Sequence, residues 1–253
     1  MPDPTLAGRS AGWSGGAEVI FFRPCATARS LPVQYVDDAG FAPAWRLWGG
    51  LSNTEGFGVD VRWWQYDQTN AIGPAAEASH LVFQKLDLVA SQRLGFRNWD
   101  LQLFAGPTYA GNGMGNAGPE GDPLNRYRWR FDGAGLTAGL QTVRGTPWLD
   151  GLSLAAGVQG SVVFGPSSLP GSYFDLGAYR QATTCATIFE LSFGPRWERR
   201  LSGGATAFAG GACEAQFWSA GLGSEAQGFF PSVGSWGGDI GLIGFSCNVG
   251  IRR

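Results

Sequence analysis

His80 is the only histidine in the chain, and it directly follows Ser79. A histidine paired with a serine is the arrangement that many hydrolases use for nucleophilic catalysis. Adjacent side chains of a strand point to opposite faces, however, so Ser79 and His80 cannot form a catalytic couple directly. The sequence therefore predicts no catalytic residues and a protein that is not an enzyme.

The metal-ligating residue types also lack the spacing that a metal site requires. No two cysteines stand at CxxC spacing, which argues against structural zinc. Acidic residues gather in expected loops without the spacing of an EF-hand: Asp37, Asp38, Asp67, Glu120 and Asp122. The glycines of 111–118 precede no helix and no Gly-Lys-Ser/Thr, so a phosphate-binding loop is not indicated either. We expect no metal and no cofactor.

The four cysteines are expected to have different surroundings. Cys25 and Cys185 fall near the same rim of the predicted fold, and an oxidising exterior would allow a bond between them. Sequence cannot place the two within bonding distance, so it does not decide whether they form a disulfide. Cys213 and Cys247 are expected to be small apolar side chains on the outer face.

Charged side chains recur at alternate positions of extended segments, where they would line the inside of a barrel. The expected set is Glu18, Arg46, Asp60, Arg62, Lys85, Asp87, Arg93, Asp100, Glu190, Arg196 and Glu214. Hairpin pairing is expected to place Arg46 beside Asp60 and Arg62, and Arg93 beside Asp100. Such a lining could select ions, or it could be a paired network that fills and rigidifies the interior. Ten strands give a diameter of roughly 20 Å, which favours a narrow or closed conduit.

Period-2 alternation predicts the ten strands that carry these side chains. They are expected at 13–23, 44–51, 56–66, 81–94, 99–110, 127–143, 152–164, 186–199, 205–218 and 238–251. Only 15% of the 253 residues are charged and 41 are glycine, which fits extended strands better than solvated helices. A net charge of −2 gives no field that would recruit nucleic acid. No run of 18 apolar residues is present, so a helical membrane span is excluded.

The connections between these strands alternate in length. Tight turns follow every second strand, and longer segments rich in turn-forming residues follow the others, at 24–43, 67–80, 111–126, 165–185 and 219–237. Short turns on one rim and long loops on the other are typical of outer-membrane barrels. We predict an all-β fold, a closed antiparallel up-and-down transmembrane β-barrel of ten strands, or twelve if two loop segments pair. One domain (13–253) would form it, after an N-terminal extension (1–12).

Aromatic residues should form two belts around an outer aliphatic band, as amphipathic rings do at two membrane–water interfaces. The belt at the short turns would contain Trp13, Phe57, Phe96, Trp99, Trp148 and Trp197. The belt at the long loops would contain Phe21, Phe22, Trp45, Trp63, Trp64, Tyr66, Tyr109, Tyr127, Trp129, Phe164, Phe217, Trp218 and Trp236. Ten tilted residues separate Trp99 from Tyr109, or roughly 23 Å, close to the ~25 Å apolar band of such barrels.

Several stretches resemble one family of outer-membrane proteins. They are WSGGAEVIFFRP (13–24), RLWGGLSNTEGFGVDVRWWQYD (46–67), LDLVASQRLGFRNWDLQL (86–103), FDGAGLTAGLQ (131–141) and GDIGLIGFSCNVGIRR (238–253). Together they resemble the pore-forming family of major-outer-membrane-protein type that is expanded in planctomycete-like bacteria. The resemblance implies a barrel in the bacterial outer membrane with a porin-like or surface-structural role, and it implies no catalytic residues.

Two functions follow as expectations. The first is a porin-like or structural barrel in the lipid bilayer of the outer membrane, with passive permeation of small ions or solutes. The alternative is a plugged barrel whose five long loops make it a surface interaction or envelope-array protein. Outward glycines such as Gly49 and Gly211 would allow close contact in a homo-oligomer. The first residues do not read as a signal peptide, so the chain is expected to be a mature form or to have its true start upstream.

Overall fold

The computed structural model describes residues 11–26, 40–72, 77–96, 99–117, 128–146, 149–169, 180–219 and 240–253. The strands in this part of the chain are β1 (Gly12–Ala26), β2 (Ala42–Ser52), β3 (Phe57–Ile72), β4 (Glu77–Phe96), β5 (Trp99–Ala117), β6 (Arg128–Gly145), β7 (Leu152–Leu169), β8 (Arg180–Arg200), β9 (Thr206–Trp218) and β10 (Ile240–Arg252). No helix in these ranges is long and apolar enough to cross a membrane.

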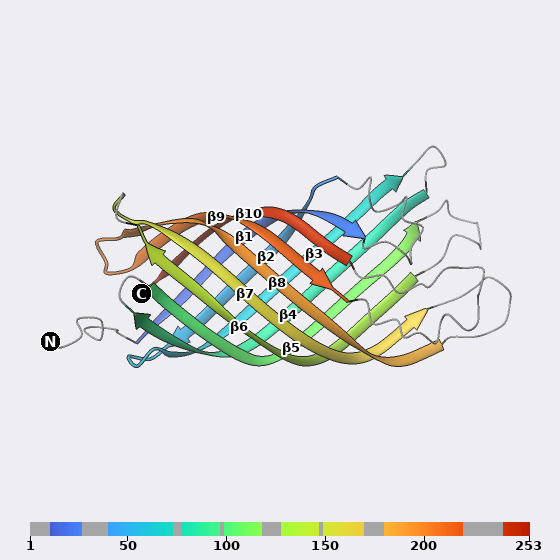
Figure 1. The fold of residues 1–253 in the computed structure, drawn as a ribbon, viewed down its shortest axis with the longest axis horizontal. Helices are drawn as coiled ribbons and strands as arrows, with labels where there is room; N and C mark the ends of the chain where they lie inside the picture. The colour runs from blue at the N-terminus through green and yellow to red at the C-terminus, as the bar shows by residue number, and fades with distance from the viewer. Residues whose placement is uncertain are drawn as a thin grey trace.

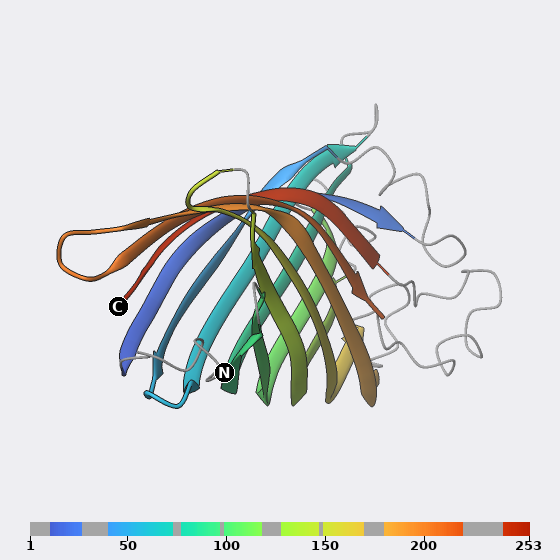
Figure 2. The same ribbon diagram turned by 60° about the vertical axis from the view of Figure 1, so that its left-hand side comes forward.

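The strands form a closed barrel in which each is antiparallel to its neighbours in sequence (Figures 1 and 2). Closure comes from β1 and β10, which pair from Ser14 opposite Arg252 to Ala26 opposite Ile240. This confirms the predicted all-β, up-and-down barrel. Because the ring closes with ten strands, the prediction of ten is correct and that of twelve is wrong.

The turns that join β2 to β3, β6 to β7 and β8 to β9 define one end of the barrel, called here the short-turn end. In the first of them, the Asn53 side-chain oxygen accepts hydrogen bonds from the backbone N–H groups of Glu55 (3.0 Å) and Phe57 (2.9 Å). Gly56 completes this turn with φ of 83°, a conformation that strains other residues. The last strand also ends here, as Figure 1 shows on its left side.

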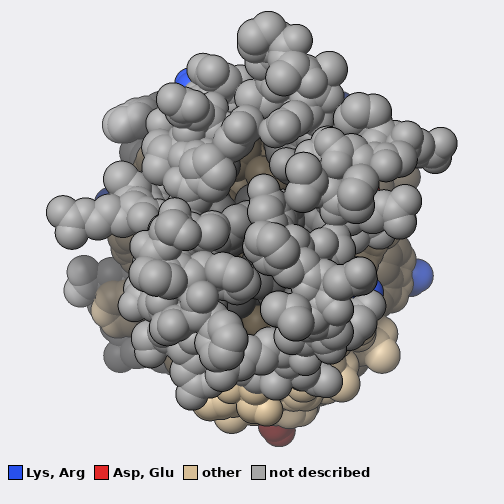
Figure 3. Space-filling model, turned by 90° about the vertical axis from the view of Figure 1, so that its right-hand side faces the viewer, with Lys and Arg blue, Asp and Glu red and all other residues tan. Residues whose placement is uncertain are grey.

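The opposite end, called here the long-loop end, differs from the prediction in where its strands stop. The segment 67–80, expected to be a loop, is mostly strand, because β3 and β4 stay paired out to Ile72 opposite Glu77. Likewise, β5 continues to Ala117 through glycines expected in a loop. Each added pair satisfies backbone N–H and C=O groups, and neither extension contains a proline to interrupt the ladder. Figure 3 views this end, with residues outside the described ranges in grey.

The two faces of the wall have opposite polarity, with apolar side chains outside. On β4, Leu86 and Leu88 are exposed on the outer surface, whereas Lys85 and Asp87, which alternate with them, are buried in the lumen. The same alternation follows β8, where the outward side chain of Leu191 is 46% exposed. A water-soluble barrel would have the reverse arrangement. The outer surface is therefore suited to lipid.

The predicted aromatic belts are correct in part. At the short-turn end the exposed members are Trp13, Phe57, Phe96, Trp99 and Trp197, and at the long-loop end they are Trp45, Tyr109, Phe164 and Phe217. Four residues assigned to the outer belt lie instead inside the barrel, namely Phe22, Trp64, Tyr66 and Trp218, each at most 4% exposed. Their positions in the alternation give the reason, since each follows an inward-facing residue two positions earlier. Trp148, Tyr127 and Trp236 lie outside the described residues, as does the side chain of Trp129.

All four cysteines are free thiols in this structure. Cys25 belongs to β1 and Cys185 to β8, two strands that are separated in the barrel by β9 and β10. Cys213 and Cys247 are exposed on the outer face of β9 and β10, as the sequence indicated.

The apolar outer band gives a first prediction. Replacing Leu191, at mid-height of β8, with arginine should destabilise the barrel in a bilayer by about 2–4 kcal/mol, because the charge would face hydrocarbon. Leu201 is similarly exposed but lies in the β8–β9 turn, where Leu201→Arg should cost only about 0–1 kcal/mol. Reversible unfolding in lipid vesicles measures both. Equal costs for the two variants would contradict a lipid-facing position for Leu191.

Candidate functional site in the barrel lumen

The inward face of each strand builds the lumen in successive layers. Along β3, the inward side chains from the short-turn end are Asp60, Arg62, Trp64 and Tyr66. The same order, polar first and apolar next, follows β1 from Glu18 to Phe22 and β9 from Glu214 to Trp218. Around the barrel these residues form a charged layer and, nearer the long-loop end, an apolar one.

The apolar layer is a packed cluster that we call the aromatic plug. Its members are Ile20, Phe22, Ala42, Ala44, Trp64, Tyr66, Leu81, Phe83, Ala110, Phe131, Val163, Ala186, Ile188, Trp218, Ile240 and Leu242. All ten strands contribute to it, and none of the members is more than 8% exposed. The members of the plug are therefore as buried as the residues of a protein core.

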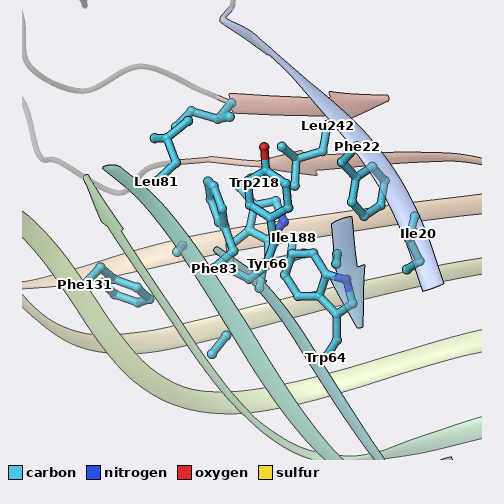
Figure 4. Close-up of a cluster of buried hydrophobic side chains, with 14 of the residues drawn as sticks. Ile20, Phe22, Trp64, Tyr66, Leu81, Phe83, Phe131, Ile188, Trp218 and Leu242 are labelled. Carbon is cyan, nitrogen blue, oxygen red and sulfur yellow. The ribbon is translucent and has the colours of Figure 1, made fainter. Parts of the chain in front are cut away.

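The centre of the plug consists of aromatic rings that contact one another (Figure 4). The rings of Trp64 and Trp218 stack with centroids 5.7 Å apart, and Phe83 lies 5.0 Å from Trp218. Phe22 meets Trp64 edge-on at 6.1 Å. These residues come from β1, β3, β4 and β9, so the contacts cross the lumen and do not merely follow the wall. Offset and edge-to-face pairs of this kind stabilise the fold beyond the contribution of the apolar area that they bury.

Two polar groups of the plug have partners, whereas the indole N–H of Trp64 has none among the described residues. The Tyr66 hydroxyl donates to the side-chain oxygen of Gln68, whose amide donates to the Gly40 carbonyl at 3.2 Å. The Trp218 indole N–H donates to Gln216 at 3.1 Å. Buried hydroxyl and indole groups would otherwise cost free energy, so these bonds fix the orientation of the two rings.

Arg46 is the centre of the charged layer. Its guanidinium donates to Glu18 at 2.5 Å and to both oxygens of Glu214, at 3.1 and 2.9 Å, and it lies 3.8 Å from Glu190. The predicted neighbours of Arg46 were Asp60 and Arg62, and that prediction is wrong. The β2–β3 register sets Trp64 opposite Arg46, and the curvature of the barrel brings Glu214 of β9 to it instead.

Lys85 extends this network to the far wall. Its ammonium group pairs with Glu190 and lies 3.4 Å from Asp87. Asp87 accepts hydrogen bonds from Thr108 (2.6 Å) and Gln159 (2.8 Å), so β5 and β7 are joined to it. Each of these charges thus has an opposite charge or a neutral donor, which offsets the cost of taking it out of bulk water.

Between the charged layer and the short-turn end lies a cavity of about 260 Å³. All eleven charged residues predicted for the lumen border it. Arg93 and Asp100 are one diagonal step apart in the β4–β5 register, in which Arg93 faces Gln102 and Gly95 faces Asp100. Arg196 pairs with Glu198 at 3.0 Å and covers the Phe208 ring at 3.9 Å, and Arg252 also reaches Glu198, at 2.7 Å.

Sequence reasoning missed the plug and two of the aromatic residues under arginines, Phe104 and Phe208. The signal that could have found them is the alternation of inward and outward side chains along a strand. Phe104 is two residues after the inward Gln102, and Phe208 is two residues before the inward Gly210.

Most of the candidate residues for chemistry lie outside the described part of the chain. His80 lies in β4 with its backbone opposite Thr69 and Gly115, and its side chain is outside the described part of the structure. Asp37, Asp38, Glu120 and Asp122 also lie outside it. Among the residues that are described, no three histidine, cysteine or acidic side chains form a group suited to a metal ion.

No protein-family model and no curated protein matches the chain. Among solved structures, it is similar to the outer membrane protease OmpT from Escherichia coli, with a TM-score of 0.50 and 10% identity over 98% of this chain and 99% of that one. A major outer membrane protein from Thermus thermophilus matches at 0.45, with 11% identity over 97% and 100%. The beta domain of the Bordetella autotransporter BrkA matches at 0.49, with 15% identity over 96% and 99%.

The fold and its likeness to the Escherichia coli structure define the class: an antiparallel β-barrel of the outer-membrane type. That neighbour is a protease and this chain shares 10% of its residues, so the likeness establishes the fold and not an activity.

The Arg46 network gives a second prediction. Arg46→Met removes the cation shared by Glu18 and Glu214 and should destabilise the barrel by about 3–5 kcal/mol, since it leaves buried carboxylates unpaired. Arg130→Met is the matched control, because its pair with Asp132 lies on the outside with the Arg130 side chain 67% exposed, and should cost about 0–1 kcal/mol. Urea unfolding of both variants in the same detergent tests this. A loss below about 1 kcal/mol for Arg46→Met would show that the network is not stabilising.

Proposed function

We propose that the protein spans a bacterial outer membrane as a ten-stranded barrel with lipid as its outer partner. The exposed leucines and valines of the outer wall, the aromatic residues at both ends and the polar lumen support this placement. Closure of the sheet leaves no unpaired strand edge to face lipid, as a membrane-spanning β-structure requires.

We further propose that the barrel is closed to passive ion flow and acts as a non-enzymatic structural or interaction protein of the envelope. The observation that carries this proposal is the aromatic plug, to which all ten strands contribute buried side chains. An ion crossing the plug would lose its hydration among side chains that are mainly aliphatic and aromatic, at a cost of many kcal/mol. Interaction would then fall to the long connections between strands. Four of the five remain long, since the one between β3 and β4 spans only 73–76.

Porin-like permeation is the second candidate, and the polar cavity at the short-turn end favours it. It would require the plug to be displaced from the lumen. Assembly into a homo-oligomer through outward glycines stays a prediction.

Conductance in a planar bilayer tests these alternatives and is the third prediction. The unaltered protein should insert without discrete current steps. A Trp64→Ala/Trp218→Ala double variant, which removes the two stacked rings of the plug, should conduct in salt-dependent steps. Trp197→Ala, on the outer face, is the control and should stay silent.

The electrophoretic mobility of each unheated variant, compared with that of the heated sample, shows whether the variant is folded. This distinguishes a folded barrel with an open lumen from an unfolded protein. Regular steps from the unaltered protein would overturn the closed-lumen proposal and favour the porin-like one.

A further inference from the structure

The charges that border the lumen cavity are nearly all matched by a partner. Arg46 is bound by Glu18 and Glu214, and Lys85 by Glu190 and Asp87. At the short-turn end, Glu198 receives both Arg196 and Arg252. Arg93 and Asp100 are also engaged in interactions of their own. Two charges on β3 do not follow this pattern, those of Asp60 and Arg62.

The direct contact of Arg62 is a stacking one, although the charges of Asp60, Asp87 and Glu190 also act on it. Its guanidinium carbon lies 3.9 Å from the centre of the Phe104 ring, a cation–π contact. Within the described part of the chain it has no carboxylate within ion-pairing distance and makes no hydrogen bond. Stacking uses the face of a guanidinium and leaves its in-plane N–H donors for a planar acceptor such as a carboxylate. Arg62 borders the cavity, so these donors have space beside them.

Asp60 has neutral partners only. Its Oδ2 atom accepts hydrogen bonds from the Ser91 hydroxyl at 2.8 Å and the Gln102 amide at 3.1 Å. Its Oδ1 atom accepts none from the described residues, and no cation there pairs with it. These two neutral donors hold the carboxylate in place without cancelling its charge. Asp60 also borders the cavity, although only 9% of its surface is exposed.

The two residues are arranged as a pair of opposite charges that do not meet. They are two positions apart on the same face of β3, so their Cα atoms are separated by about 6.6 Å, yet they form no ion pair with each other. The whole lining is balanced around them. The eleven predicted lumen residues and Arg252 comprise six acidic and six basic side chains.

We propose that this cavity binds a small zwitterion that carries an ammonium and a carboxylate on one carbon, as an α-amino acid does. The ligand carboxylate would accept hydrogen bonds from Arg62, and its ammonium would donate to Oδ1 of Asp60. A simple anion would be attracted by Arg62 but repelled by Asp60. A simple cation would be attracted by Asp60 but repelled by Arg62. The balanced lining adds no field in favour of either ion. This inference goes beyond the proposed function and holds whether or not the lumen conducts.

Three matched probes test the inference on the full chain folded in detergent micelles. L-alanine carries both charges, propionate has only the carboxylate and ethylammonium has only the ammonium. Titration calorimetry should give an affinity for L-alanine about tenfold or more above that for either half-probe. Equal affinities for the three, or no binding of L-alanine, would overturn the proposal without any need for a variant.

Two variants then assign the charges and form the fourth prediction. Asp60→Asn, which keeps the shape and the bonding to Ser91, should lose the preference for L-alanine and bind propionate at least as well. Arg62→Gln should shift the preference to ethylammonium. Asp132→Asn, on the outer face, is the control and should bind all three probes as the unaltered protein does. Retention of the L-alanine preference in both β3 variants would place the binding elsewhere and overturn the assignment.

Discussion

Closure of the sheet by hydrogen bonds between β1 and β10 is the constraint on which the rest of the barrel depends. In hydrocarbon an unpaired backbone group costs several kcal/mol, so a spanning sheet cannot leave two edges open. Once the ring is closed, every residue is either inside or outside, and a register slip of one residue would exchange the two faces of a strand. The alternation along each strand therefore sets both faces together: a register that places leucine outside also places the charged residues inside.

An inside that receives every second residue of ten strands has to be filled or hydrated. This lumen is filled by two different means. Toward the long-loop end, large rings such as Trp64 and Trp218 meet across the barrel and exclude water. Next to them, Arg46 and Lys85 join carboxylates from opposite walls. The two layers share their strands, so the interior resembles a protein core with a polar half, and a cavity lies toward the short-turn end.

Alternation and turn spacing predicted the ten strands, and the loops, aromatic belts and low charge together predicted which face of each strand lies inside. Two features were beyond them. Trp64 and Trp218 lie in the lumen and not in the predicted outer belt, because the alternation that places Arg62 and Gln216 on the inward face continues two residues further along each strand. Of the partners of Arg46, Glu18 lies directly opposite it in the β1–β2 pairing, but Glu214 could not be read from any hairpin. The contact between Arg46 and Glu214 joins residues 168 positions apart, and only the curvature and stagger of the closed ring create it.

That separation in sequence also has a kinetic meaning. Arg46 belongs to the second strand to be made and Glu214 to the ninth, so their ion pair can form only when nearly the whole chain is in place. Contacts between such distant segments form late, because the loop between them must be closed first. Interactions absent from the folding transition state act on the rate of unfolding and hardly on the rate of folding. We therefore expect the Arg46 cluster to have little effect on the rate of folding and to slow the unfolding of the finished barrel.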